Sequence, residues 1–332
     1  MRQVLSRPVP FLLHPAVKDY LWGGTRLNDD FSKHIPSDVV AETWECSTHP
    51  DGVSIAASGD GFGMPLDEIL RMHPEYLGEH AHGGADLPVL VKLIDAKRDL
   101  SVQVHPDDDF AHAHEGGQPG KAEMWYVMDA EPSSRIAYGL HHAVARELFL
   151  KAIGDGTVEK YLQMVPVRKN DLFFIPPGTV HAIGRGCLIA EIQQNSNLTY
   201  RLYDYNRTDR NGTMRPLHLD KGLAVANLDV MPEPRQPMRL LRYSGGMASE
   251  LLCRCRYFQV ERVLVNTEQR RDMASFHPTA ETFEILLFLN GCGTLFSADS
   301  MLQFFKGDCV FVPAGSSEIR LHARTEFLRI TC

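Results

Sequence analysis

The sequence lacks long hydrophobic runs, basic clusters and a pairing pattern among its cysteines. No window approaches the roughly 18 uninterrupted apolar residues of a membrane-spanning helix. Pro8, Pro10 and Pro15 interrupt the N-terminal stretch, so we expect neither a membrane span nor a secretory leader. The net charge of −8 and the lack of a Lys/Arg-rich run argue against a nucleic-acid or membrane partner. The same charge still allows a local cationic pocket that binds a small anion.

The seven cysteines are scattered, and only Cys253 and Cys255 lie close together. A C-x-C pair on a strand is too tight for an easy disulfide, and no second pair completes a zinc-type motif. We therefore interpret all seven as reduced thiols of a cytoplasmic protein.

What the chain does contain is a series of short apolar or alternating runs. Its 332 residues, 44% of them hydrophobic, suit one large or two medium globular domains. Runs rich in β-branched and aromatic residues, bounded by Gly, Pro and Asp, predict strands. They occupy residues 53–58, 88–95, 100–105, 123–129, 171–176, 187–194 and 198–205. Helical spacing covers residues 65–78, 142–156 and 215–228.

Part of the sequence is repeated. Residues 169–183 align without gaps with residues 306–320, which pairs Asp171 with Asp308, and residues 123–131 align with 284–292. Two β-rich copies predict a mostly β protein of two jelly-roll β-barrels with a small helical insertion. His181 of the first copy falls opposite Glu318 of the second, so we expect the chemistry in the first barrel.

Three segments follow from this repeat. Residues 1–228 are expected to form the catalytic barrel with an N-terminal extension and the helical insertion. Residues 229–238, with three prolines, are the expected linker. Residues 239–332 are then a second, degenerate barrel.

Four metal-capable side chains lie in the first copy: Gln103, His105, Glu123 and His181. Gln103 and His105 are two apart on a strand and share a face. Each residue alone has an ordinary explanation, such as a hydrogen-bonded histidine at a strand end, a surface glutamate or a structural histidine in a turn. Together, two imidazoles, a carboxylate and an amide oxygen suit Zn²⁺ and would also accept Mn²⁺, Co²⁺ or Fe²⁺.

Three long stretches, residues 101–130, 171–207 and 215–224, closely resemble type I mannose-6-phosphate isomerases of the cupin superfamily, in their shorter bacterial form. The resemblance runs from residue 22 to about residue 228. It implies one catalytic zinc per chain, bound by Gln103, His105, Glu123 and His181. It also implies three catalytic candidates, Arg201, Lys121 and Glu191. Three further residues are implied as substrate contacts: Lys92, Trp22 and Glu45.

An aldose–ketose isomerase moves a proton between C1 and C2 through a cis-enediol. A divalent cation can polarise the substrate oxygens and stabilise the enediolate. The candidates for the general base are Lys121, Glu191 and a hydroxide on the metal. Arg201 does not release its proton, so it is the better candidate for stabilising negative charge or gripping an anion.

Two alternatives stay open at this point. One is an isomerase of unphosphorylated mannose, which would lack an anion site and would not be inhibited by free phosphate. The other is a non-catalytic sugar-binding cupin, although retention of the complete residue set argues against it. A sugar phosphate is the expected partner, and the chain is expected to be a monomer or homodimer.

Overall fold

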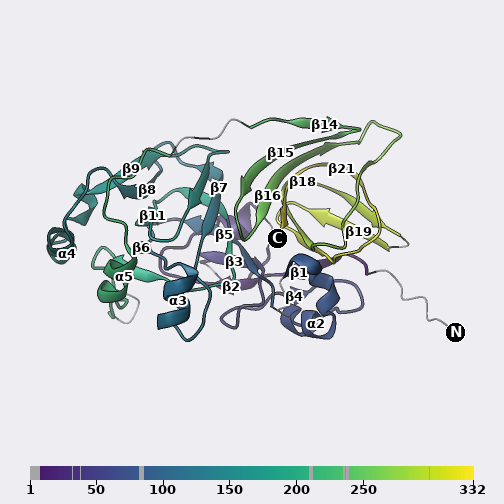
Figure 1. Ribbon diagram of the computed structural model, residues 1–332. Helices are drawn as coiled ribbons and strands as arrows, with labels where there is room; N and C mark the ends of the chain where they lie inside the picture. The colour runs from purple at the N-terminus through teal and green to yellow at the C-terminus, as the bar shows by residue number, and fades with distance from the viewer. Residues whose placement is uncertain are drawn as a thin grey trace.

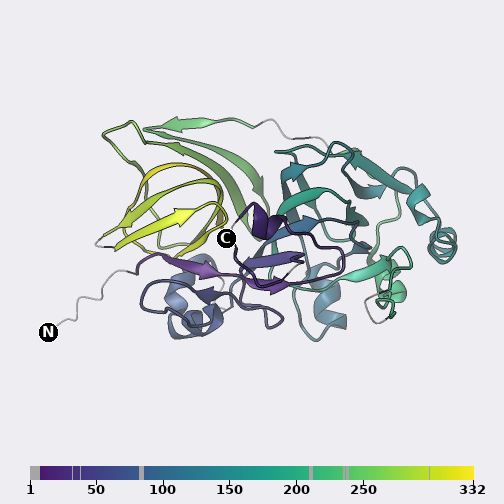
Figure 2. The same cartoon turned by 180° about the vertical axis from the view of Figure 1, so that it is seen from behind.

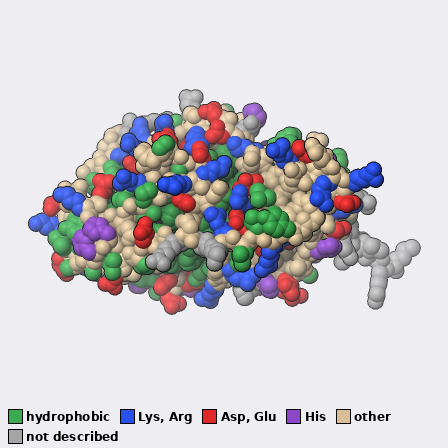
Figure 3. Space-filling model, turned by 90° about the horizontal axis from the view of Figure 1, so that it is seen from above, with side chains coloured by type: hydrophobic (Ala, Val, Ile, Leu, Met, Phe, Trp, Pro, Cys, Tyr) green, Lys and Arg blue, Asp and Glu red, His purple; other side chains and the backbone are tan. Residues whose placement is uncertain are grey.

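The computed structural model describes residues 8–31, 33–37, 39–81, 86–208, 212–234, 236, 239–298 and 300–332. Two β-rich lobes lie side by side, and the N-terminal part of the chain runs beneath both (Figures 1 and 2). On the face seen in Figure 3, basic and acidic side chains are interspersed. The predicted mostly β, cupin-type fold is confirmed.

The first lobe is built from two sheets that face each other. The six-stranded sheet has the order β10-β7-β12-β5-β3-β2, and the five-stranded sheet the order β13-β6-β11-β8-β9. The strands of the first sheet are β2 (Ala16–Lys18), β3 (Glu42–Cys46), β5 (Val89–Ala96), β7 (Glu123–Ala130), β10 (Leu172–Ile175) and β12 (Cys187–Gln194). Those of the second are β6 (Val102–Val104), β8 (Arg135–Leu140), β9 (Leu162–Pro166), β11 (His181–Ile183) and β13 (Tyr200–Tyr203). A core that includes Trp125, Ile183 and Ile189 fills the space between them.

The second lobe is one ten-stranded sheet with the main order β14-β15-β16-β21-β18-β20-β1-β4, in which β17 pairs with β21 and β19 with β18. Its C-terminal strands are β14 (Arg242–Ser244), β15 (Met247–Arg254), β16 (Gln259–Asn266), β17 (Ala274–Phe276), β18 (Glu284–Ser297), β19 (Ser300–Phe305), β20 (Cys309–Val312) and β21 (Ile319–Thr331). Two N-terminal strands, β1 (Phe11–His14) and β4 (Ile55–Ala56), complete it.

The N-terminal extension therefore lies across both lobes. Sequence patterning assigned residues 1–228 to the first barrel, whereas β1 hydrogen-bonds to β20 of the second. Local patterns do not reveal where an extension docks, because the docking depends on a partner strand about 300 residues away. The division at residues 229–238 stays a prediction, and residues 235, 237 and 238 of this linker lie outside the described part of the chain.

Short helices connect the strands. They are α1 (Arg26–Asp29), α2 (Leu66–Met72), α3 (Asp108–His114), α4 (Arg146–Gly154) and α5 (Leu219–Val225), with 3₁₀ turns η1 (Pro74–Leu77), η2 (Glu79–Ala81) and η3 (Val158–Lys160). The helix predicted over residues 65–78 is divided because Pro74 carries no N–H to continue the ladder. The helix predicted over 215–228 is also shorter than expected. In the part of the chain that the structure describes, no helix is both long and apolar enough to cross a membrane.

The repeat is visible in two matching turns. Asn170 and Gly307 both adopt positive φ, at 73° and 93°. The aspartate that follows each, Asp171 or Asp308, accepts a hydrogen bond of 2.8 Å from the backbone N–H three residues before it. Each turn leads into a strand paired with the strand whose first residue is Glu123 or Glu284. The aligned segments thus have the same local structure in both lobes.

An aromatic stack stabilises the second barrel. Phe288 is fully buried, its ring lies 3.8 Å from that of Phe304, and the Phe327 ring is 5.2 Å away. We expect Phe288→Ala to lower the free energy of unfolding by about 3–5 kcal/mol, because it opens a cavity that the neighbouring rings cannot fully fill. Urea denaturation tests this, with the exposed Phe305→Ala as the control, for which the expected change is within about 0.5 kcal/mol. Equal losses in both variants would contradict the packing.

Candidate active site

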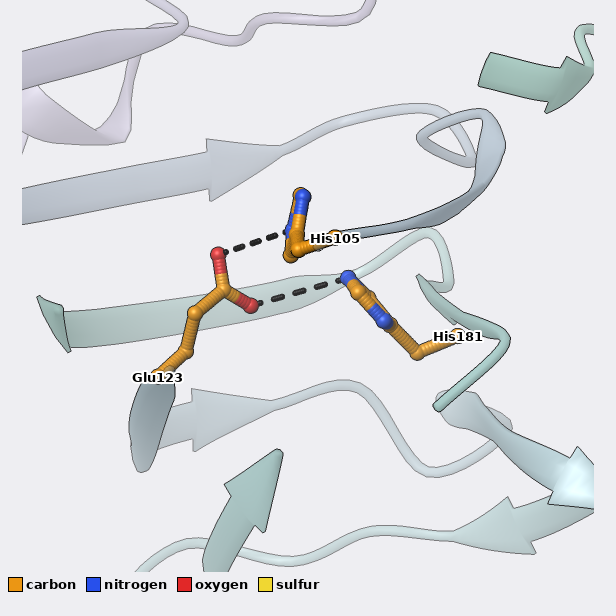
Figure 4. Close-up of side chains that lie close together, drawn as sticks. All are labelled: His105, Glu123 and His181. Atoms are coloured by element: carbon orange, nitrogen blue, oxygen red, sulfur yellow. Dashed lines mark ion pairs between the residues drawn. The ribbon is translucent and has the colours of Figure 1, made fainter. Parts of the chain in front are cut away.

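Three buried side chains meet at one end of the first barrel (Figure 4). His105 follows β6, Glu123 begins β7 and His181 begins β11, and none is more than 1% exposed. His105 Nε2 lies 3.1 Å from Glu123 Oε1, and His181 Nε2 lies 3.5 Å from Glu123 Oε2. Ligand atoms of a tetrahedral zinc lie about 3.3 Å apart when each bond is about 2.0 Å. The group is therefore compatible with a metal ion.

Unpartnered atoms support this interpretation. Both ring nitrogens of His105 and both carboxylate oxygens of Glu123 are buried without a properly oriented hydrogen bond. Lys121 Nζ lies close to Glu123 Oε1, but the His105 ring and Glu123 Oε2 have no hydrogen bond. Buried polar groups are normally satisfied, so these atoms indicate a missing partner. A divalent cation would satisfy the atoms that face one another.

The protonation states also suit a cation. Burial and the nearby charge of Lys121 lower the pKa of His105 to about 3, and burial lowers the pKa of His181. Burial opposes ionisation of Glu123, but Lys121 and His105 outweigh it and hold the carboxyl pKa well below its usual range. The set therefore presents neutral imidazoles and a carboxylate, the forms that bind metals.

A second contact orients His181. Its Nδ1 donates to the carbonyl of Thr179 at 2.8 Å, which leaves the lone pair of Nε2 directed toward Glu123. Gln103 is the backbone partner of His181 across β6 and β11, and its amide nitrogen lies 3.3 Å from His181 Nε2. A half turn of this amide exchanges its oxygen and nitrogen and directs Oε1 to the same place. The structure thus brings the four sequence-predicted ligands together.

A cavity of about 480 Å³ opens beside this group. Six sequence-predicted residues line it: Gln103, Lys121, Glu191, Arg201, Lys92 and Trp22. Lys121 Nζ lies 2.7 Å from Glu123 Oε1, so this lysine joins the cavity to the buried group.

Lys92 and Glu191 form a buried ion pair in the cavity wall. They are backbone partners on β5 and β12, with Lys92 Nζ 3.0 Å from Glu191 Oε1 and 3.9 Å from Glu42 Oε2. Burial would lower the pKa of Lys92, but the two carboxylates outweigh it and raise the pKa. Burial and the charge of Glu123 raise the pKa of Glu191. The Trp125 indole donates to Glu191 Oε2 at 2.9 Å, which fixes the carboxylate.

Arg201 differs from the other cations that line the cavity. Each of the others forms an ion pair with a carboxylate: Lys92, Lys121, Arg215 and Lys221. Arg201 has no carboxylate partner among the described residues, its Nη1 donates to the carbonyl of Pro216, and its buried Nε makes no hydrogen bond. The cavity therefore contains one cation whose charge is available to an anion.

Glu45 lies away from the cavity. It accepts a hydrogen bond of 2.6 Å from Thr43 and pairs with Lys33 at 2.7 Å. Glu42, three residues earlier, lines the cavity and receives the Trp44 indole N–H at 2.7 Å. Alternation along β3 places the two glutamates on opposite faces, and of the two only Glu42 lines the cavity.

Sequence reasoning also missed one segment of the cavity wall. Arg215, His218 and Lys221 line it, although residues 215–228 were predicted as a helix and these three residues were given no role in the site. The sequence signal that could have identified them is their spacing of three residues, which places basic side chains at regular intervals in a stretch with few other charges.

Comparisons with known proteins identify the family of the chain. The family model described as phosphomannose isomerase type I, catalytic domain, matches residues 11–142. A probable mannose-6-phosphate isomerase of Bacillus subtilis, GmuF, is 35% identical over 96% of this chain and 98% of its own length. The mannose-6-phosphate isomerase ManA of the same organism is 37% identical, with 96% and 97% covered.

Solved structures agree in fold. The crystal structure of a mannose 6-phosphate isomerase from Bacillus subtilis superposes with a TM-score of 0.89 at 33% identity, over 97% of this chain and 99% of that one. A phosphomannose isomerase variant from Salmonella typhimurium shares the fold, with a TM-score of 0.76 at 16% identity over 97% and 99% of the two chains. The protein belongs to the type I mannose-6-phosphate isomerase family.

Proposed function

We propose that this protein interconverts mannose 6-phosphate and fructose 6-phosphate with one Zn²⁺ held by Gln103, His105, Glu123 and His181. The observation that carries the proposal is the set of buried atoms of His105 and Glu123 without a hydrogen bond, beside a cavity in which Arg201 has no carboxylate partner among the described residues. The relatives' names supply the substrate. Seven cysteines without a disulfide support a cytoplasmic location.

The cavity residues would divide the reaction between them. A divalent cation bound by the four ligands supplies Lewis-acid polarisation of the substrate oxygens at C1 and C2. Lys121 and Glu191 both line the cavity, and we propose that they move the proton between the two carbons. Glu191 is held by Lys92 and Trp125, whereas Lys121 pairs with Glu123 and, among the described residues, with no other carboxylate. Trp22 and Lys92 would limit the access of water and position the sugar.

Arg201 would bind the negatively charged group of the substrate. It is the backbone partner of Gln103 across β13 and β6, and its guanidinium is the one cation of the wall without a carboxylate in the described residues. An arginine can bind a phosphoryl group through two parallel hydrogen bonds, and burial strengthens the attraction. An anion site in this position favours a phosphorylated sugar over free mannose.

A coupled assay tests the proposal. We expect turnover of mannose 6-phosphate that a chelator abolishes and added Zn²⁺ restores, because the buried donor atoms require a cation. Free phosphate should inhibit, since it competes for Arg201. Activity that withstands complete metal removal would reject the metal role. Metal-loaded protein that binds mannose 6-phosphate without turnover would favour the non-catalytic sugar-binding cupin, and equal turnover of mannose without phosphate inhibition would favour the other isomerase.

A further inference from the structure

His218 is joined to Arg201 by two backbone contacts. The N–H of His218 donates to the Arg201 carbonyl at 2.8 Å, and the Arg201 N–H donates to His218 Nδ1 at 3.1 Å. Arg201 is the second residue of β13 and His218 directly precedes α5, and both residues line the cavity. The imidazole cannot turn without breaking the bond from Arg201.

This contact fixes the tautomer of His218. A backbone N–H can only donate, so Nδ1 must be the acceptor and the ring proton must lie on Nε2. Burial, with the positive charges of Arg201 and Lys221, lowers the pKa of His218, so the ring is neutral. Nε2 forms no hydrogen bond within the described residues and is not buried, while the residue lines the cavity. His218 thus offers one N–H donor of fixed direction.

The surroundings indicate what this donor would meet. Arg215 is paired with Asp204 and Lys221 with Glu115, both within 2.7 Å. Arg201 has no carboxylate partner among the described residues. Asp204 also pairs with Arg207, so the four cations and two carboxylates leave a net charge of +2 at this wall, which attracts a phosphate anion. A neutral donor adds a hydrogen bond there without the repulsion of a further cation.

We propose that His218 donates a hydrogen bond from Nε2 to the phosphate group of the substrate, and that it thereby helps to select phosphorylated sugars. The inference rests on the proposed function and assigns a specificity-determining contact within the same cavity. Arg201 supplies the charge, and His218 supplies a directed donor whose orientation Arg201 itself maintains.

Two substitutions separate the two nitrogens of the ring. Asparagine places an acceptor oxygen near the position of Nδ1 and so keeps the bond from Arg201, but it does not reach the position of Nε2. Glutamine reaches that position with an N–H and gives up the Nδ1 acceptor. We expect His218→Asn to raise KM for mannose 6-phosphate about tenfold with kcat within about twofold. His218→Gln should recover part of the loss in KM.

The control is His112→Asn, because His112 is exposed on α3 and does not line the cavity. Binding of inorganic phosphate to the zinc-loaded protein, measured by calorimetry, should weaken in His218→Asn by a similar factor and stay unchanged in the control.

A His218→Asn variant with wild-type KM and phosphate affinity would overturn the proposal. So would an equal rise in KM for mannose and mannose 6-phosphate, which would place the donor on a sugar hydroxyl. If wild-type protein fails to turn over mannose 6-phosphate, the proposed function fails, and the phosphate titration still tests His218.

Discussion

Glu123→Gln is expected to lower kcat/KM for mannose 6-phosphate by about a thousandfold or more and to leave the purified protein without its metal. Glu123 is the one carboxylate of the buried group, and its two oxygens face His105 and His181. Glutamine has nearly the same shape but lacks the charge, so the remaining donors are all neutral. The change also leaves Lys121 without its ion-pair partner, which adds repulsion toward a dication.

Metal per chain and kcat/KM are measured on the same preparation. The control is Glu147→Gln, because Glu147 is an exposed residue of α4 that does not line the cavity, and its substitution removes the same charge. It should keep both metal and activity. A Glu123→Gln protein that carries a full equivalent of zinc and turns over normally would remove Glu123 from the site.

Arg201→Ala is expected to lower kcat/KM by about a hundredfold to a thousandfold while the metal content stays unchanged. The guanidinium contributes the one uncompensated charge of the cavity wall in the described residues, and its Nε is buried without a partner. Its removal takes away the attraction for the substrate anion and leaves the ligand group intact. Arg201→Lys should recover only part of the loss, because an ammonium group cannot make the paired contacts of a guanidinium.

Arg242→Ala serves as the control, since Arg242 is exposed on β14 of the other lobe. Thermal unfolding of each variant shows whether a loss of activity reflects a loss of structure. Normal kcat/KM in a folded Arg201→Ala protein would exclude Arg201 from substrate binding. Loss of zinc together with activity would show that its role is to support the metal group.

Strand periodicity accounts for much of what the sequence could predict about the site. Gln103 and His105 were assigned to one face because side chains alternate along a strand, and both lie at the buried group. Lys121 is two residues before Glu123, and their charged atoms are 2.7 Å apart. Asn170 has a φ of 73°, a left-handed conformation that asparagine tolerates.

Contacts between distant segments explain the rest. Glu45 lies next to a bulge between Trp44 and Cys46, and it faces Lys33 instead of the cavity. His218 reaches the cavity because the chain returns to β13 after a loop. The docking of β1 against β20 likewise depends on a strand from the other lobe. In each case another part of the chain sets the environment of the residue.

The central claim is that one cation lies among Gln103, His105, Glu123 and His181. Anomalous diffraction at the zinc edge, from crystals soaked in Zn²⁺, tests it most directly. The account predicts one strong peak within about 2.0–2.2 Å of His105 Nε2, His181 Nε2 and a carboxylate oxygen of Glu123. Featureless density at that position in active, zinc-replete protein would contradict it.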